Sequence, residues 1–289
     1  MAITAAMVKE LRERTGLGMM DCKKALTEAG GDMELAIEEL RKRSALKAAK
    51  KAGRTTADGL LGVKVADDGS RGALIEVNIE TDFAAKNDKF IGFVDAVLNQ
   101  VFDSGVTDLE TLMAGELGEA RATLVQEIGE NINVRRAECF ISDGGSISSY
   151  LHSDKRKAAL VELAKANDEL GRDIAMHVTA IAPMVVESSE VAADVLSKER
   201  EIYTSQAADS GKPPEIVEKM VEGRVRKFLQ EISLVDQAFV KDGNTSVGKL
   251  LADDGNSALR FVRFEVGEGI EVEATDFAAE VAAQISGEA

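Results

Sequence analysis

The chain carries few of the side chains with which enzymes usually perform acid–base or nucleophilic chemistry. It has two histidines, His152 and His177, and two cysteines, Cys22 and Cys139, which form no CxxC motif. His177 falls on the apolar face of a predicted helix, which favours packing, whereas surface contact and a structural role are equally open for His152. No nucleophile elbow, HExxH motif or P-loop occurs, although a Ser-His-Asp or Cys-His site is not excluded. We predict no catalytic residues, no cofactor and two buried thiols.

A five-residue sequence around an aromatic side chain is the strongest functional signal. TDFAA occurs at residues 81–85 and again at 275–279. In the first copy, Phe83 stands among polar residues and has no apolar helical stripe to join. Either Thr81 or Asp82 caps the next helix and Phe83 folds back as a hydrophobic staple, or Phe83 projects as a wedge for a partner protein. We favour the wedge.

The second copy of TDFAA has a different context. Phe277, Val281 and Ile285 recur there at four-residue spacing, which is typical of a packed helix face. We therefore expect the second copy to be structural.

The segment around the first copy belongs to a weak internal repeat. Residues 60–101 predict strand, turn, strand and helix, and residues 147–181 repeat this order. The strand sequences ALIE and ALVE match, and both helices open with Asn-Asp. The Asn that opens the helix lies 11 positions after the end of the matching strand sequence in the first unit, and 5 positions after it in the second. The first TDFAA is therefore predicted to be an insertion at a strand-to-helix junction, where function is commonly added to a fold.

The first part of the chain, 1–54, predicts a small all-helical module with a basic extension. Thr4 is a candidate cap for the first of three helices. Apolar residues at helical spacing are expected to form the core, namely Val8, Leu11, Ala25, Leu26, Ile37 and Leu40. Leu17, Met19 and Met20 lie at the first turn of a helix, where we expect exposure and a place for a partner helix. The basic stretch 41–54 predicts a helical extension that becomes a linker near Gly53.

The remaining chain predicts a core of strands and helices with one long insertion. Residues 186–235 hold two helical patterns with narrow apolar seams around the breaker GKPP, which predicts a protruding antiparallel hairpin. We expect an α+β fold with the following parts: 1–54, helical domain and linker; 55–140, core N-subdomain; 141–185 and 236–272, core C-subdomain; 186–235, hairpin; 273–289, C-terminal helical module.

Charge and hydropathy exclude several classes of function. The chain has 51 acidic and 35 basic residues, a net charge of −16, which argues against a protein that follows a phosphate backbone. Its longest apolar run, AIAPMVV, is too short for a membrane span, and no secretory leader is recognised, so we expect a cytoplasmic protein. The carboxylates are dispersed, which disfavours a metal site.

Several long segments resemble bacterial translation elongation factor Ts in the family's order. They are VKELRERTGLGMMDCKKALTEAGGDMELAIEELRKR, TDFAAKND, AMHVTAIAP, GKPPEIVEKMVEGRVRKFLQEISLVDQAFVKD and RFEVGEGIE. The resemblance covers essentially the whole chain. It implies a ubiquitin-associated-like N-terminal domain, a core of two related subdomains with antiparallel sheets, a coiled-coil hairpin and a C-terminal helical module.

The resemblance also implies a function. The family exchanges guanine nucleotide on elongation factor Tu, without turnover chemistry of its own, by dislodging the GTPase's magnesium ion. Its TDFV motif corresponds to Thr81, Asp82, Phe83 and Ala84, with Ala in place of the more usual Val. Family positions that hold a helix of the GTPase correspond to Leu11, Met19 and Met20, and a core contact corresponds to His152.

Other functions stay open at this stage. A scaffold or chaperone-like adaptor would use the same helix-binding module and hairpin without affecting a nucleotide. RNA binding through residues 41–54 is a third hypothesis, although this stretch has no aromatic residue on which a base could stack. We expect no direct contact with nucleic acid or membrane, and a 1:1 or 2:2 complex with elongation factor Tu.

Overall fold

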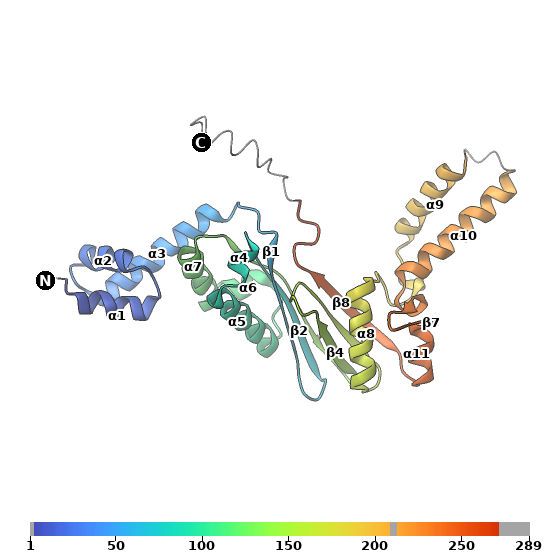
Figure 1. Ribbon diagram of the computed structural model, residues 1–289, viewed down its shortest axis with the longest axis horizontal. Helices are drawn as coiled ribbons and strands as arrows, with labels where there is room; N and C mark the ends of the chain where they lie inside the picture. Colours follow the sequence, from blue (N-terminus) through green and yellow to red (C-terminus); the bar gives the residue numbers. More distant parts are fainter. Residues whose placement is uncertain (1–2, 209–212, 272–289) are drawn as a thin grey trace.

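The computed structural model describes residues 3–208 and 213–271. Helices and small antiparallel sheets follow one another along an elongated molecule (Figure 1). A three-helix module lies at one end and a helical hairpin at the other, with two sheets between them. The expected α+β class is confirmed. The predicted C-terminal helical module, 273–289, lies outside the described residues.

The N-terminal module forms because each helix has a clear start signal and an apolar face. It comprises α1 (Ala5–Thr15), α2 (Met19–Glu28) and α3 (Met33–Lys51). The Thr4 hydroxyl accepts a hydrogen bond from the Met7 N–H at 3.3 Å, as the sequence predicted, and Asp32 caps α3 in the same way. The predicted basic extension is confirmed, since α3 continues through it to Lys51.

One prediction for this module is wrong. Leu17 was expected at an exposed turn, but it is 3% exposed and belongs to the module's core. Gly16 ends α1 in the left-handed region at φ 72°, where other residues are strained, and the chain turns back at this point. The turn places Leu17 beside Cys22, whose thiol lies 3.7 Å from the Leu17 carbonyl oxygen.

The first core unit is a three-stranded antiparallel sheet covered by helices. Its strands are β1 (Asp58–Val65), β2 (Arg71–Ile79) and β3 (Ile132–Ile141), in the order β1-β2-β3. The helices are α4 (Asp82–Ala85), α5 (Asp88–Ser104), α6 (Leu109–Met113) and α7 (Glu116–Ile128). The strand, turn, strand and helix predicted for residues 60–101 are confirmed.

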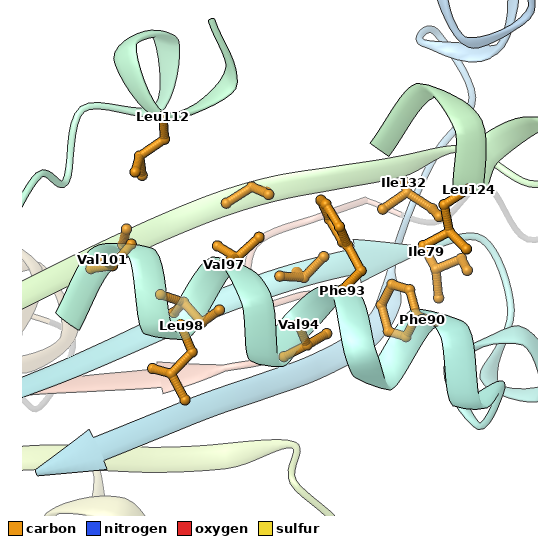
Figure 2. Close-up of a cluster of buried hydrophobic side chains, with 14 of the residues drawn as sticks. Ile79, Phe90, Phe93, Val94, Val97, Leu98, Val101, Leu112, Leu124 and Ile132 are labelled. Atoms are coloured by element: carbon orange, nitrogen blue, oxygen red, sulfur yellow. The ribbon is translucent and has the colours of Figure 1, made fainter. Parts of the chain in front are cut away.

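The apolar face of α5 forms the core of this unit. Six side chains of α5 are buried: Phe90, Phe93, Val94, Val97, Leu98 and Val101. Figure 2 shows them together with Ile79 and Ile132 from the sheet and with Leu112 and Leu124 from α6 and α7. Asn87 caps α5 by accepting from the Lys89 N–H at 2.9 Å. Packing against α5 therefore fixes the end of β2, from which the inserted TDFAA starts.

The second core unit repeats this plan. It contains β4 (Ser146–Leu151), β5 (Lys157–Leu163), α8 (Asp168–Ile181) and β8 (Ala258–Glu265), and its sheet has the order β4-β5-β8. The central strands share a further detail, because the register with the third strand shifts directly after Glu76 in β2 and directly after Glu162 in β5. The predicted repeat is confirmed. The short helix α4 lies between β2 and α5, at the predicted insertion, whereas β5 runs into α8 through four residues.

Matching arginine contacts join the two sheets. Arg136 of β3 donates to Glu76 at 2.6 Å and lies 4.2 Å from the ring centroid of Phe264 in β8. Arg260 of β8 donates to Glu162 at 2.6 Å and stacks at 4.1 Å on Phe140 of β3. Each arginine thus pairs with a carboxylate of its own sheet and with an aromatic ring of the other sheet, so the two units are held as one body.

The hairpin and a small subdomain lie between α8 and β8 in the sequence. The elements are η1 (Ser188–Glu190), α9 (Ala193–Ala208), α10 (Pro214–Ile232), η2 (Leu234–Asp236), β6 (Ala238–Phe239), β7 (Asp242–Ser246) and α11 (Val247–Asp253). Helices α9 and α10 pack on each other and project away from the sheets (Figure 1). The two helices lie in the segment for which an antiparallel hairpin was predicted, and its coiled-coil character stays a prediction.

Candidate functional site

The first TDFAA forms a separate short helix, α4, at the end of β2. The Thr81 backbone is extended, and its hydroxyl accepts from the Ala84 N–H at 3.2 Å, which begins the helix. Ala85 is 4% exposed and Ala84 packs against the first core cluster, so one side of α4 is anchored. Phe83 lies on the other side and is 82% exposed. The alternative in which Phe83 folds back as a buried hydrophobic staple is therefore excluded.

The side chains beside Phe83 are charged and paired. Lys86 donates to Asp82 at 2.8 Å, and its ammonium group lies 5.4 Å from the Phe83 ring centroid. The hydrogen bond from Lys86 holds the pKa of Asp82 below its ordinary value, and the charge of Arg156 acts in the same direction. Asp82 is thus an anion at neutral pH. The exposed surface of α4 presents an apolar ring next to a carboxylate.

The turn between β4 and β5 lies at the same end of the sheets as α4. Arg156 of this turn donates to Asp58 of β1 at 2.5 Å, and α4 packs beside β1. His152 is in the same turn, half exposed, with Nδ1 3.0 Å from Asp154 Oδ1. The structure therefore places the turn of His152 at the same end of the sheets as Asp82, and the charge of Arg156 in that turn reaches the Asp82 carboxylate.

The N-terminal module carries a second surface. A groove of about 600 Å³ runs between α1 and α2 and is lined by Ile3, Thr4, Ala5, Val8, Lys9, Arg12, Met19, Met20 and Lys23. Met19 and Met20 are 58% and 76% exposed, so the groove has an apolar floor and a basic rim. Leu11 does not line it, because it is fully buried in the module's core. In the free chain Leu11 supports the helix that forms one wall of the groove, and its direct contact with a partner stays a prediction.

These two surfaces are separate. The groove between α1 and α2 lies at one end of the molecule, whereas α4 lies beside the first sheet (Figure 1). The structure therefore brings Asp82 and Phe83 toward the turn of His152, but it does not bring Met19 or Met20 to them. A partner that uses both surfaces must be large enough to contact both.

Two side chains at this site escaped the sequence analysis. Lys86 follows Asp82 by four positions, the spacing of a helical ion pair, and could have been found. Glu130 accepts from both the backbone N–H and the hydroxyl of Thr81, at 3.0 and 2.8 Å. Because 49 positions separate these residues, no local pattern indicates the contact.

His177 and the two cysteines differ in how deeply they are buried. His177 is fully buried, and its Nδ1 accepts from the Val240 N–H at 3.1 Å. Nε2 therefore carries the hydrogen and donates to Gln237 at 2.8 Å. Burial lowers the pKa of His177, so the predicted packing role is confirmed. Cys22 is buried as predicted, but Cys139 is only half-buried.

The described part of the chain holds neither a cluster of metal ligands nor a membrane-spanning helix. Within residues 3–208 and 213–271, no group of three or more His, Cys, Asp or Glu side chains is placed to hold a metal ion. In the same residues, no helix combines the length and the apolar character needed to cross a membrane.

Comparisons with known proteins place the chain in a family. The sequence model of the family described as Elongation factor TS matches residues 80–268. An elongation factor Ts of Hahella chejuensis is 57% identical over 286 residues, and that of Saccharophagus degradans is 56% identical over 286 residues; each match covers 99% of both chains. That of Cellvibrio japonicus is 54% identical over 288 residues, covering 100% of this chain and 99% of the relative. The chain therefore belongs to the elongation factor Ts family.

Proposed function

We propose that this chain is a guanine-nucleotide exchange factor for elongation factor Tu. It binds the GDP form, displaces the GTPase's magnesium ion with the segment Thr81, Asp82, Phe83 and Ala84, and promotes GDP release for GTP loading during translation elongation. The observation that carries this proposal is the exposure of Phe83 on an inserted helix whose opposite side is anchored. A large apolar ring kept in water gains free energy when a partner buries it.

The geometry suits a wedge rather than a reacting group. Mg²⁺ requires near-ideal octahedral coordination, so a small displacement of its loop weakens its hold on the nucleotide phosphates. Phe83 supplies bulk for that displacement, and the Asp82 carboxylate beside it supplies negative charge, which competes for positively charged partners of the phosphates. The factor acts by binding and needs no turnover chemistry of its own.

One aromatic side chain does not provide enough free energy for the exchange. Burial of a Phe side chain contributes about 1.5–3 kcal/mol, whereas changing a two-state population from 1:99 to 99:1 takes about 5.5 kcal/mol. A second surface must contribute, and the groove with Met19 and Met20 is available for it. Its rim residues Lys9, Arg12 and Lys23 favour a partner helix with acidic side chains. By linkage, nucleotide binding to elongation factor Tu then weakens this complex by the same factor.

The Val-to-Ala difference at position 84 affects packing and leaves the wedge itself unchanged. Ala84 is partly buried against the first core cluster, on the anchored side of α4. A smaller side chain there reduces the contact of α4 with the core, while Phe83 remains exposed on the other side. We expect a modest effect on how firmly α4 is held.

The basic stretch in α3 is better explained by ion pairs than by RNA. Four of its basic side chains have acidic partners: Arg41 with Glu119, Lys42 with Glu38 and Glu39, Arg43 with Glu28, and Lys47 with Asp21. These pairs reduce the positive charge that a phosphate backbone would meet. We therefore propose no direct nucleic-acid contact, a place of action in the cytoplasm and a complex with one or two copies of each protein.

The proposal is tested by the release of a fluorescent GDP analogue from elongation factor Tu. We expect substoichiometric amounts of this chain to accelerate release many-fold and to turn over among many GTPase molecules. A chain that binds elongation factor Tu but leaves the release rate unchanged would instead be the adaptor. Capture of elongation factor Tu should weaken when excess GDP is added, and RNA affinity that falls steeply with salt would favour the third hypothesis.

A further inference from the structure

The exposed Phe83 raises the question of what holds its helix in place. Helix α4 has four residues, too few to be stable by themselves, because the first helical turn fixes several residues for one hydrogen bond. Phe83 contributes little to folding, since most of its surface stays in water. Its orientation therefore depends on the contacts at the two ends of α4.

The start of α4 is attached through the Thr81 hydroxyl. This hydroxyl donates to Glu130 Oε1 at 2.8 Å, which directs its hydrogen away from the helix and leaves a lone pair for the Ala84 N–H. Glu130 Oε2 accepts from the Thr81 backbone N–H at 3.0 Å. A single carboxylate thus fixes both the backbone and the side chain of the N-cap, through hydrogen bonds strengthened by its charge.

A reciprocal contact holds the backbone next to Glu130. Glu80, which precedes Thr81, accepts from the backbone N–H of Asn131, which follows Glu130, at 2.5 Å. Glu130 thus accepts from Thr81, and Glu80 accepts from Asn131. The two contacts cross in opposite directions between the end of β2 and the start of β3. The Asn131 side chain is buried and donates to the carbonyl oxygens of Ala52 and Arg54 at 3.4 and 3.0 Å. The base of α4 is thereby connected to the linker after α3.

From this geometry we infer that Glu130 is a positioning residue for nucleotide exchange, acting through Thr81 on the orientation of Phe83. The inference rests on the proposed function, since it assumes that Phe83 is the wedge. Glu130 needs no contact with the GTPase. Its removal leaves Phe83 present but releases the N-cap of α4, so the wedge is directed less well.

The test measures the maximal rate of GDP release from elongation factor Tu as a function of the concentration of the full-length chain. Glu130→Ala removes both acceptors and should lower the maximal rate about fivefold or more. This is the rate ratio that corresponds to the free energy of a lost N-cap. Glu130→Gln keeps one acceptor and should give an intermediate rate. The half-saturating concentration should change less than twofold. Glu138→Ala, an exposed glutamate on β3, is the matched control and should resemble the unmodified chain.

A double-mutant cycle distinguishes positioning from a general loss of structure. If Glu130 acts through Phe83, Glu130→Ala should have no further effect on the maximal rate in a Phe83→Ala background. An equal fold effect in both backgrounds would overturn the inference, as would a normal maximal rate for Glu130→Ala beside a slow Phe83→Ala. A normal rate for Phe83→Ala would overturn the proposed wedge and this inference with it. Melting temperatures identify a misfolded variant, in which case Glu130→Gln gives the result.

Discussion

Replacing Phe83 with Ala separates binding from nucleotide release. Because the side chain is 82% exposed in the free chain, its truncation should leave the free energy of unfolding within about 0.5 kcal/mol of the unmodified value. The Asp82 to Lys86 ion pair and the Thr81 cap are formed by other atoms and should persist. The change therefore removes the ring and little else.

The size of the expected effect follows from the exposed fraction. Full burial of a Phe side chain contributes about 1.5–3 kcal/mol, and about four fifths of that contribution is still available in the free chain. If this free energy is used at the point where GDP leaves, its loss of about 1.2–2.5 kcal/mol lowers the maximal release rate about 8- to 70-fold. Affinity for nucleotide-free elongation factor Tu should fall much less.

Stopped-flow release of a fluorescent GDP analogue at saturating chain concentration measures this rate directly. Leu46→Ala is a suitable control, because Leu46 is also a well-exposed apolar residue, at 64%, but lies on α3 away from α4. An unchanged maximal rate for Phe83→Ala would refute the wedge. A proportional loss of affinity for the nucleotide-free GTPase would show that Phe83 contributes uniform binding and does not drive release.

Further predictions concern the groove, the second TDFAA and acid stability. Met20→Ala should weaken binding of elongation factor Tu about 5- to 50-fold, measured by titration, and leave the melting curve unchanged. Leu11→Ala should instead destabilise the N-terminal module by about 2–5 kcal/mol in denaturant unfolding. The reverse pattern would place Leu11 at the interface. Phe277→Ala should lower the melting temperature and spare exchange, and lost exchange at a constant melting temperature would mean that the two copies are reversed. Burial raises the pKa of Glu76, but the Gly267 N–H, Asn78 and Arg136 outweigh burial and leave the pKa below its ordinary value. The stability that Glu76 contributes should therefore be present above pH about 4.5 and be lost as pH falls through the lowered pKa. Glu76→Gln should flatten the acid limb of a curve of unfolding free energy against pH. An unchanged slope would contradict this role of Glu76.

Local signals in the sequence predicted much of the fold. The asparagines before α5 and α8 and the apolar spacing of α5 are enough to place those helices, because capping and burial of one face act within a few residues. The length difference between the repeated units also located α4 correctly. In these segments the sequence pattern and the tertiary structure have the same physical cause.

The features that were missed depend on contacts between distant residues. The burial of Leu17 follows from the left-handed conformation of Gly16, which redirects the chain after α1. The contact from Glu130 to Thr81 joins residues 49 positions apart. The stacking of Arg136 on Phe264 requires the two sheets to meet. None of these contacts has a periodicity, so only the assembled fold reveals them.

The base of the helical hairpin has a consequence for the entropy of the chain. The Val185 carbonyl accepts from the Leu234 N–H at 2.9 Å, and Val185 forms an isolated bridge with Ser233, so the two ends of the hairpin meet at the core. For the second sheet, the hairpin is only a long closed loop between β5 and β8. Doubling or halving a flexible loop changes its closure free energy by only about 0.6 kcal/mol. The arm can therefore change in length over evolution, or be shortened in the laboratory, while the second sheet keeps nearly the same stability.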